Sequence, residues 1–293
     1  MPGKKINIKE SPEEVWINPT GGFGDILMLS GVLKKYSELY PERKFNLVRR
    51  AIYSDLFKGH PAVKKTGYPP KNADIITTDY WSKEKLGKGN QRPFQILSRL
   101  FGIPTPAAEN LYMPGNNYED RLLQEFIPSR GKKIAVIAPS SVSPRKTMEP
   151  VIWQDIVDKM SNKGFFVIQV GQQRDIYIKG AYSLLGLTTL RQLVALLIKC
   201  NIIISIDNFV MHAAHLTGKP AVIIWGPTSS GVYGYPEQIH FQCSKSHCEF
   251  RNKCLGPEFP DNYSEPCPLG QRHCMNGVLT DKVIKSALNA SFS

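Results

Sequence analysis

The chain has 293 residues, of which 42% are hydrophobic, and its formal net charge is +12. The hydrophobic fraction excludes a disordered chain, and the length is enough for about two ordinary domains. The first residues lack the apolar core of a secretory signal, and no apolar run approaches the roughly 18 residues that span a bilayer, so we expect a soluble, cytoplasmic protein. Two explanations of the positive charge stay open, because charge alone does not distinguish them. One is a solvated basic surface, and the other is attraction to nucleotides, nucleic acid or an anionic membrane surface.

The first half of the chain alternates short strands with helical patterns. In chain order we predict a strand at 15–18, a helix at 26–40, strands at 45–48 and 74–77, and a helical pattern over 94–101. The alternation restarts after the polar stretch 128–131. We predict a strand that begins at 132, a helix at 150–163, a strand at 165–170, a helix after Thr189, a strand at 202–206, a helix at 211–216, a strand at 221–225 and a helix at 281–290.

Two successive series of this kind predict an α/β protein with two doubly wound parallel-sheet domains and a cleft between them. We place the N-terminal domain at residues 1–130 and the C-terminal domain at 131–293, the latter including a cysteine-rich segment at 243–274.

The segment GGFGD at 21–25 follows a predicted strand and opens a predicted helix. Glycines such as Gly22 and Gly24 let backbone amides approach a ligand closely, and a helix N-terminus favours negative charge. The segment is neither GxGxxG nor a Walker sequence, so it does not predict a dinucleotide-binding fingerprint. Asp25 has two roles open, as a cap of the first helical turn or as a general base that takes a proton from a nucleophilic hydroxyl.

A second polar strand end lies at Asp207, directly after the isoleucine-rich strand at 202–206. Loops at the carboxyl ends of parallel strands, beside helix N-termini, are where doubly wound folds bind ligands. We therefore expect this loop to bind an anionic ligand. Two roles stay open for His212, near the start of the following helix: a structural role, or a part in this pocket.

The segment APSSVSPRK at 138–146 also follows a strand. Ser140 and Ser141 are hydrogen-bond donors, while Arg145 and Lys146 are either surface cations or groups that neutralise a departing diphosphate. Gln173, at the next strand end, is either an exposed loop residue or a partner for a ribose hydroxyl. The chain has no DxD motif, so side chains and helix dipoles must supply the positive charge that a diphosphate needs.

Five of the six cysteines lie in the C-terminal segment, at Cys243, Cys248, Cys254, Cys267 and Cys274. Without a signal peptide, such clustering favours metal ligation or free thiols over disulfides. The spacing matches no paired CxxC zinc pattern, so a structural zinc or iron site and free thiols both stay open.

Three segments in this order, GGFGDILMLSGVLKKY, LLGLTTLRQLVALL and DNFVMHAAHLTGKPAVIIWGPT, resemble glycosyltransferase family 9, the heptosyltransferases of lipopolysaccharide synthesis. The resemblance implies the GT-B architecture, two Rossmann-like domains facing across a cleft, with acceptor bound mainly by the first and nucleotide sugar by the second. It also implies an inverting, metal-independent transfer, with ADP-heptose as the expected donor. The expected acceptor is a lipopolysaccharide core or another glycan or lipid-linked hydroxyl, with peripheral contact at the inner membrane surface.

The resemblance also implies roles for single residues. Asp25 matches the catalytic base of the family. The donor-binding positions are Gly22, Gly24, Ser140, Ser141, Arg145, Lys146, Gln173, Leu187, Asp207, Asn208, His212, Gly226 and Thr228. Two positions depart from the family, since Phe209 stands where a glycine is usual and Gln173 where a carboxylate is usual.

Other functions stay open at this point. The C-terminal cysteines are similar to those of family members that bind iron and glycosylate proteins, which makes a protein O-glycosyltransferase one alternative. A second is a nucleotide-sugar-binding relative without transferase activity. A cysteine-rich nucleic-acid-binding protein is a third, but the cations are dispersed rather than set in a stripe with aromatic residues, so we expect no nucleic-acid partner.

Overall fold

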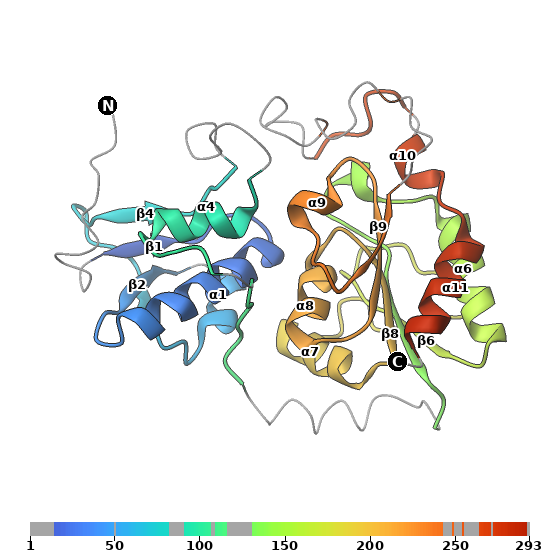
Figure 1. The fold of residues 1–293 in the computed structure, drawn as a ribbon, viewed down its shortest axis with the longest axis horizontal. Coiled ribbons are helices and arrows are strands. Elements are labelled where there is room, and N and C mark those ends of the chain that lie inside the picture. Colours follow the sequence, from blue (N-terminus) through green and yellow to red (C-terminus); the bar gives the residue numbers. More distant parts are fainter. Residues whose placement is uncertain are drawn as a thin grey trace. The chain divides into compact units, whose positions relative to one another are not determined.

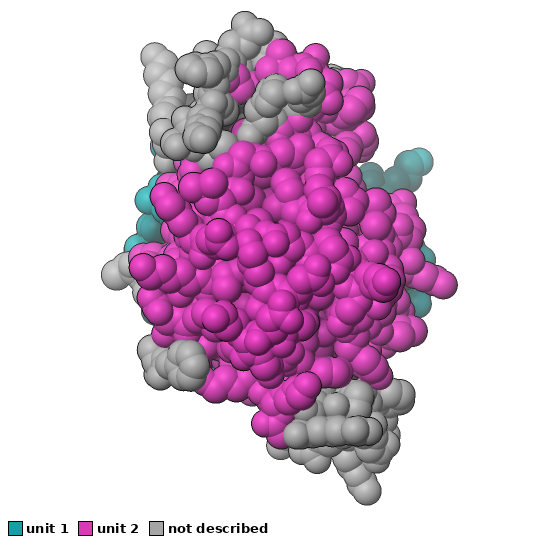
Figure 2. Space-filling view, turned by 90° about the vertical axis from the view of Figure 1, so that its right-hand side faces the viewer, with its two compact units in different colours: residues 1–115 teal, residues 116–293 magenta. Residues whose placement is uncertain are grey.

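The computed structural model describes residues 15–49, 51–81, 91–106, 109–115, 131–242, 248, 254, 264–270 and 272–291. The chain divides into two compact units, residues 1–115 and 116–293, which Figure 2 colours separately. Each unit contains its own parallel sheet, as the α/β prediction requires. Residues 116–130, between this division and the predicted boundary, lie outside the described residues, so the boundary at 130 stays a prediction.

Unit 1 is built on a four-stranded sheet in the order β3-β2-β1-β4, and all of its strand pairs are parallel (Figure 1). Its elements are β1 (Trp16–Asn18), α1 (Phe23–Leu39), β2 (Phe45–Val48), α2 (Ala51–Ser54), the 3-10 helix η2 (Asp55–Phe57), β3 (Val63–Gly67), β4 (Ile75–Thr77) and α4 (Pro93–Leu100). The chain adds β2 and β3 on one side of β1 and β4 on the other. The loops after β1 and β4 therefore meet at a topological switch point.

Helix α1 is the central packing element of unit 1. Its residues 26–33 are all buried, since the helix contacts η2 and α4 as well as the rest of the core. At its C-terminal end, Tyr36 packs on Phe45 of β2 with ring centroids 4.8 Å apart, and Phe45 packs edge-on to Phe101 at 5.6 Å. These aromatic contacts fix the helix on the sheet and so position its N-terminus at the switch point.

Unit 2 is built on a six-stranded parallel sheet in the order β10-β9-β8-β5-β6-β7. Its elements are β5 (Ile134–Ala138), the 3-10 helix η3 (Pro144–Lys146), α6 (Pro150–Asn162), β6 (Phe166–Gln169), β7 (Tyr182–Ser183), α7 (Leu190–Lys199), β8 (Ile202–Ile206), α8 (Phe209–Thr217), β9 (Ala221–Trp225), α9 (Ser230–Tyr233), β10 (Ile239–Gln242), α10 (His273–Asn276) and α11 (Thr280–Ala290). The sheet grows from β5 toward β6 and then, on the other side, toward β8. The switch point of this unit is therefore between β5 and β8.

The three central strands of unit 2, β5, β8 and β9, are buried at every residue. Helices α7 and α8 cover one face of the sheet, and α6 and α11 cover the other (Figure 1). The isoleucine run of β8 is therefore covered on both faces, as is typical of a central strand in a parallel sheet. None of the helices in the described part of the chain is long and apolar enough to cross a membrane.

Local signals account for where the helices begin. The predicted helix after Thr189 is α7, and Thr189 caps it, because its hydroxyl accepts a hydrogen bond from the Gln192 amide at 3.2 Å. Helix α8 begins two residues earlier than the sequence predicts, because Asn208 caps it by accepting from the Val210 amide at 2.8 Å. The short elements α9, α10 and β10 were not predicted, since four residues are too few to show a helical or strand period.

Gly31 lies where α1 passes the backbone of residues 110–111. A Cβ at this position would lie 2.3 Å from the carbonyl oxygen of Asn110, and this is a backbone atom that cannot move aside alone. The neighbouring Ser30 is also fully buried, but its hydroxyl has no hydrogen-bond partner among the described residues.

We therefore predict opposite effects for two substitutions at adjacent positions. Gly31→Ala should destabilise the protein by about 2 kcal/mol, although alanine is normally the better helix former, because overpacking outweighs propensity. Ser30→Ala, the matched control, should be neutral or slightly stabilising because it removes an unsatisfied buried hydroxyl. Thermal unfolding measured by calorimetry checks both, and equal melting temperatures for the two variants would contradict the close approach.

Candidate functional site

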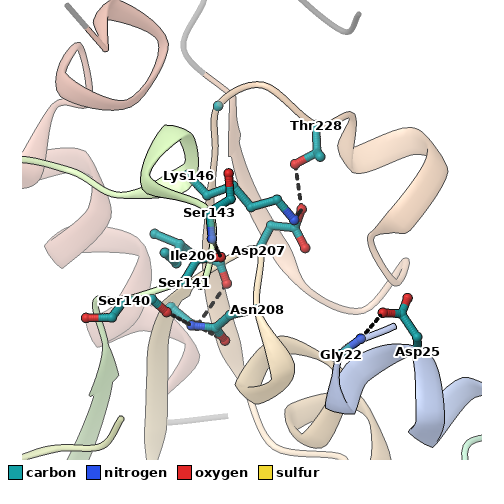
Figure 3. A network of polar contacts seen from close by, with 12 residues as sticks. Gly22, Asp25, Ser140, Ser141, Ser143, Lys146, Ile206, Asp207, Asn208 and Thr228 are labelled. Atoms are coloured by element: carbon teal, nitrogen blue, oxygen red, sulfur yellow. Dashed lines mark hydrogen bonds and ion pairs between the residues drawn. The ribbon is translucent and has the colours of Figure 1, made fainter. Parts of the chain in front are cut away.

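Three strand-end loops of unit 2 meet at the carboxylate of Asp207, which is 6% exposed. Its Oδ2 accepts a hydrogen bond from the Thr228 hydroxyl at 2.6 Å and lies 2.8 Å from the Lys146 ammonium (Figure 3). Lys146 ends η3 after β5, Asp207 follows β8, and Thr228 follows β9. The cluster therefore lies at the switch point of the sheet, and the strand-end position predicted for Asp207 is confirmed.

The electrostatics of this cluster keep Asp207 ionised. Burial alone would raise the pKa of the carboxyl, but the attraction and hydrogen bond of Lys146 and the hydrogen bond of Thr228 outweigh it, so the pKa lies below its ordinary value. A buried carboxylate is stable only while both partners hold it.

Asn208 joins the loops that carry the cluster. Its Nδ2 donates to the carbonyl oxygens of Ala138, at 3.1 Å, and Ser140, at 3.0 Å, so the end of β5 is tied to the start of α8 (Figure 3). The half-buried Ser141 accepts from the Ser143 amide at 3.3 Å, which closes the turn before η3. Asn208, Ser140 and Ser141 thus belong to the loops around Asp207, and Asn208 also shapes the loop; the donor-binding roles of the three residues stay predictions.

His212 belongs to the same site but is held neutral. It is buried in α8, and burial lowers the pKa of its imidazole to about 4 against the attraction of Asp207. Its Nδ1 shares a 2.8 Å hydrogen bond with the hydroxyl of Tyr235, whose ring also stacks on His215 with centroids 3.8 Å apart. Tyr235 cannot be identified from the sequence, because only its contact with His212 in the folded protein shows that it belongs to the site.

Arg145, beside Lys146 in sequence, is directed away from Asp207. Its side chain is buried and donates to the backbone carbonyls of Cys254, Glu265 and Pro266. Gly226 has a similar relation to the C-terminal part of the chain, because a Cβ there would lie 2.2 Å from the sulfur of Met275. These two predicted donor-binding residues therefore contact the C-terminal segment.

Gln173 and Leu187 lie together at the strand ends of β6 and β7. Gly186 has a φ of 68°, and a Cβ on it would lie 2.7 Å from the Cβ of Gln173, so a glycine lets the two loops pack. Gln173 is exposed, and Leu187 is 70% exposed. Their side chains are therefore accessible to a ligand, and the donor-binding role of both residues stays a prediction.

The cysteines do not form a metal centre within the described residues. Cys248, Cys254, Cys267 and Cys274 are described, and no group of three or more His, Cys, Asp or Glu side chains that could hold a metal ion occurs in that part of the chain. Cys243 lies outside the described residues, so the zinc or iron site stays a prediction.

Asp25 lies in the first turn of α1, at the switch point of unit 1. Its Oδ2 accepts from the Gly22 amide at 2.6 Å, and its Oδ1 accepts from the Tyr80 hydroxyl, at 2.5 Å, in the loop after β4 (Figure 3 shows the Gly22 bond). Gly22 is the cap of α1, and Gly24 lies in its first turn. The capping role of Asp25 is therefore present, and Tyr80 is a partner that the sequence analysis missed.

The Asp207 cluster predicts strong coupling between its two charges. Lys146→Met should cost about 3–5 kcal/mol, because it leaves a buried carboxylate unpaired, whereas the double variant Lys146→Met/Asp207→Asn should be more stable than Lys146→Met alone. Denaturant unfolding of the two single variants and the double variant measures this. Additive losses in the double variant would show that the ion pair is not coupled.

The neutral His212 predicts a pH dependence of stability. Between pH 6.5 and about 4 the unfolded chain binds a proton at this residue and the folded chain does not, so stability falls as the pH falls through this window, by at most roughly 3 kcal/mol. His212→Gln should reduce this slope, and buried His60, whose pKa is also about 4, should leave part of it. A His212 imidazole that titrates near pH 6.5 by NMR would contradict the burial argument.

Comparisons with known proteins agree with these two α/β units. The family model for glycosyltransferase family 9 (heptosyltransferase) matches residues 54–255, more than half of the chain. No curated protein sequence matches the chain significantly. A solved structure of a family 9 glycosyltransferase from Veillonella parvula shares 13% identity, covers 96% of this chain and 98% of its own, and has a TM-score of 0.72.

Two Escherichia coli structures are similar as well. The ADP-heptose lipopolysaccharide heptosyltransferase II has 13% identity, covers 96% of this chain and 99% of its own, and has a TM-score of 0.64. The dodecameric, iron-containing heptosyltransferase TibC, in complex with ADP-D-β-D-heptose, has 15% identity, covers 96% of this chain and 77% of its own, and has a TM-score of 0.72. Identities this low show a shared fold, and the family match adds the class of enzyme. The chain belongs to glycosyltransferase family 9 and is a glycosyltransferase.

Proposed function

We propose that this enzyme transfers heptose from ADP-heptose, with inversion and without a catalytic metal, to a hydroxyl of a lipopolysaccharide core or another glycan. We place the reaction in the cytoplasm, with the enzyme in peripheral contact with the inner membrane surface. The observation that carries the proposal is the buried Lys146–Asp207–Thr228 cluster at the switch point of unit 2. It brings a cation and a hydroxyl donor to the strand end where parallel α/β sheets bind phosphates.

Binding of the donor requires the Lys146 ammonium to contact the diphosphate while it lies beside Asp207. Its ammonium lies 2.8 Å from the Asp207 carboxylate, and its side chain is 11% exposed. A diphosphate would share the ammonium with Asp207, since an ammonium has three N–H donors, and the positive end of the α8 dipole would add to the attraction. Asp207 would then keep the hydroxyl of Thr228 and continue to orient Lys146.

The nucleoside is assigned to the exposed pair at the neighbouring strand ends. Gln173 would donate to or accept from a ribose hydroxyl, and Leu187 would pack on the base. ADP-heptose is chosen because one of the similar solved structures is an ADP-heptose lipopolysaccharide heptosyltransferase and another is a heptosyltransferase bound to ADP-D-β-D-heptose. Phe209, at the start of α8, is the side chain that would limit the size of the transferred sugar.

Asp25 would act on the acceptor. The acceptor oxygen forms a bond to the anomeric carbon, its proton passes to the Asp25 carboxylate, and the anomeric bond to the diphosphate oxygen breaks to release ADP. The Asp25 carboxylate accepts hydrogen bonds from the Gly22 amide and the Tyr80 hydroxyl. These two donors orient the base.

The cysteines are assigned no part in the transfer. We propose that a zinc or iron ion, if the C-terminal segment holds one, has a structural role. Its ligands would come from Cys243, Cys248, Cys254, Cys267 and Cys274.

The test separates donor binding from transfer. Calorimetric titration should show that the wild type binds ADP and ADP-heptose more tightly than UDP or UDP-glucose. Asp25→Asn should keep ADP-heptose affinity within about twofold and lose transfer by roughly 10²–10⁴-fold, because only proton acceptance is removed.

Tyr80→Phe is the matched control at the same carboxylate. It removes one orienting hydrogen bond but leaves the base, so transfer should fall by about tenfold or less and donor affinity should not change. Full turnover by Asp25→Asn would remove Asp25 as the base. If the wild type binds no nucleotide diphosphate, the donor site itself is wrongly assigned.

A further inference from the structure

We infer that Arg145 is a positioning residue, which docks the η3 turn on the C-terminal segment and so holds Lys146 ready for the donor diphosphate. The C-terminal segment here means Cys254 and residues 264–270 and 272–276. The inference rests on the proposed function, because it concerns how the donor site is kept in shape. It gives Arg145 a role distinct from direct contact with the donor.

The contacts of Arg145 leave little of the guanidinium for a ligand. The residue is 3% exposed. Its Nε donates to the carbonyl oxygens of Glu265 and Pro266, both at 3.1 Å, and its Nη1 donates to the carbonyl oxygen of Cys254 at 2.9 Å and approaches the Cys254 sulfur at 3.2 Å. A guanidinium fixed by three backbone carbonyls is an anchor.

The anchor is one residue from the functional cation. Arg145 and Lys146 share the three-residue turn η3, and their side chains run in different directions, one to the C-terminal segment and one to Asp207. Since the turn is so short, a shift of the backbone at Arg145 also moves the Cα of Lys146. The Lys146 side chain has four methylene groups joined by rotatable bonds. Holding it in place lowers the conformational entropy that is lost when the ammonium binds a phosphate.

A second attachment lies on the other side of Lys146. Arg272 donates to the Thr147 hydroxyl at 2.8 Å and also binds the Glu149 carboxylate, while the Glu149 amide donates to the Asn276 side chain at 3.0 Å. The loop that carries Lys146 is therefore fixed to the C-terminal segment at two points, one before and one after the lysine. If the loop were attached on only one side of Lys146, the lysine could move together with the unattached side.

The same segment supports the third member of the cluster. Met275 packs against Gly226, two residues before Thr228. Thus the C-terminal segment contacts both loops that hold the Asp207 carboxylate.

The experiment is a double-variant cycle on ADP binding, measured by calorimetric titration well below the melting temperature. Arg145→Met should weaken ADP binding at least tenfold, and Arg145→Lys, which can keep one carbonyl contact, should fall between it and the wild type. In a Lys146→Met background, Arg145→Met should cause no further loss, because its effect passes through Lys146. Arg92→Met, which breaks the Arg92–Glu109 ion pair of unit 1, is the control and should leave ADP affinity unchanged.

Each other outcome decides against the inference. Additive losses in the double variant would mean that Arg145 contacts the diphosphate itself. A lower melting temperature with unchanged ADP affinity would mean that Arg145 only stabilises the fold.

A milder variant keeps the test usable if Arg145→Met does not fold. Arg272→Gln removes the second attachment at a partly exposed residue, and it should weaken ADP binding about threefold in the wild type and not at all in Lys146→Met. If the wild type binds no nucleotide diphosphate, the proposed donor site fails. If Lys146→Met binds ADP more weakly than the wild type, an unaffected Arg145→Met and Arg272→Gln would overturn the positioning role alone.

Discussion

The ionised carboxylate of Asp207 is the constraint on which the second unit depends. A charge that is 6% exposed needs a counter-charge and hydrogen bonds close by, so Lys146 and Thr228 must be brought to it from two other loops. The loops after β5, β8 and β9 are fixed relative to one another by this need. The buried apolar strands β5, β8 and β9 supply stability that offsets the cost of burying an ion pair in the loops at their ends.

Sheet topology explains why the candidate residues of both units occupy corresponding places. In unit 1 the strand order reverses between β1 and β4, and the bond from Tyr80 to Asp25 joins the loops after these strands. In unit 2 the reversal is between β5 and β8, and Asn208 joins the corresponding loops. In each case a polar side chain joins two loops that the sheet leaves open, which is why such crevices can hold ligands without a loss of order.

Much of this was predictable from sequence. The strands at 202–206 and 221–225, the helix after Thr189 and the position of Asp207 at a strand end follow from local sequence patterns, and the structure confirms them. The partners of the site residues were not predictable in the same way. Tyr80 is 55 residues from Asp25, Tyr235 is 23 residues from His212, and the carbonyls that hold Arg145 are more than 100 residues away. Sequence periodicity carries no information on such pairings, because they are set by the packing of whole elements.

The contact of Gly226 with Met275 has a consequence for how this region can vary. The Met275 side chain occupies the space that a side chain at position 226 would need, so neither position can change in size alone. A larger residue at 226 requires a shorter one at 275, and a shorter one at 275 leaves a hole beneath the loop of Thr228 unless 226 grows. We expect the two positions to vary as a pair among related enzymes, which links the evolution of the donor loop to that of the C-terminal segment.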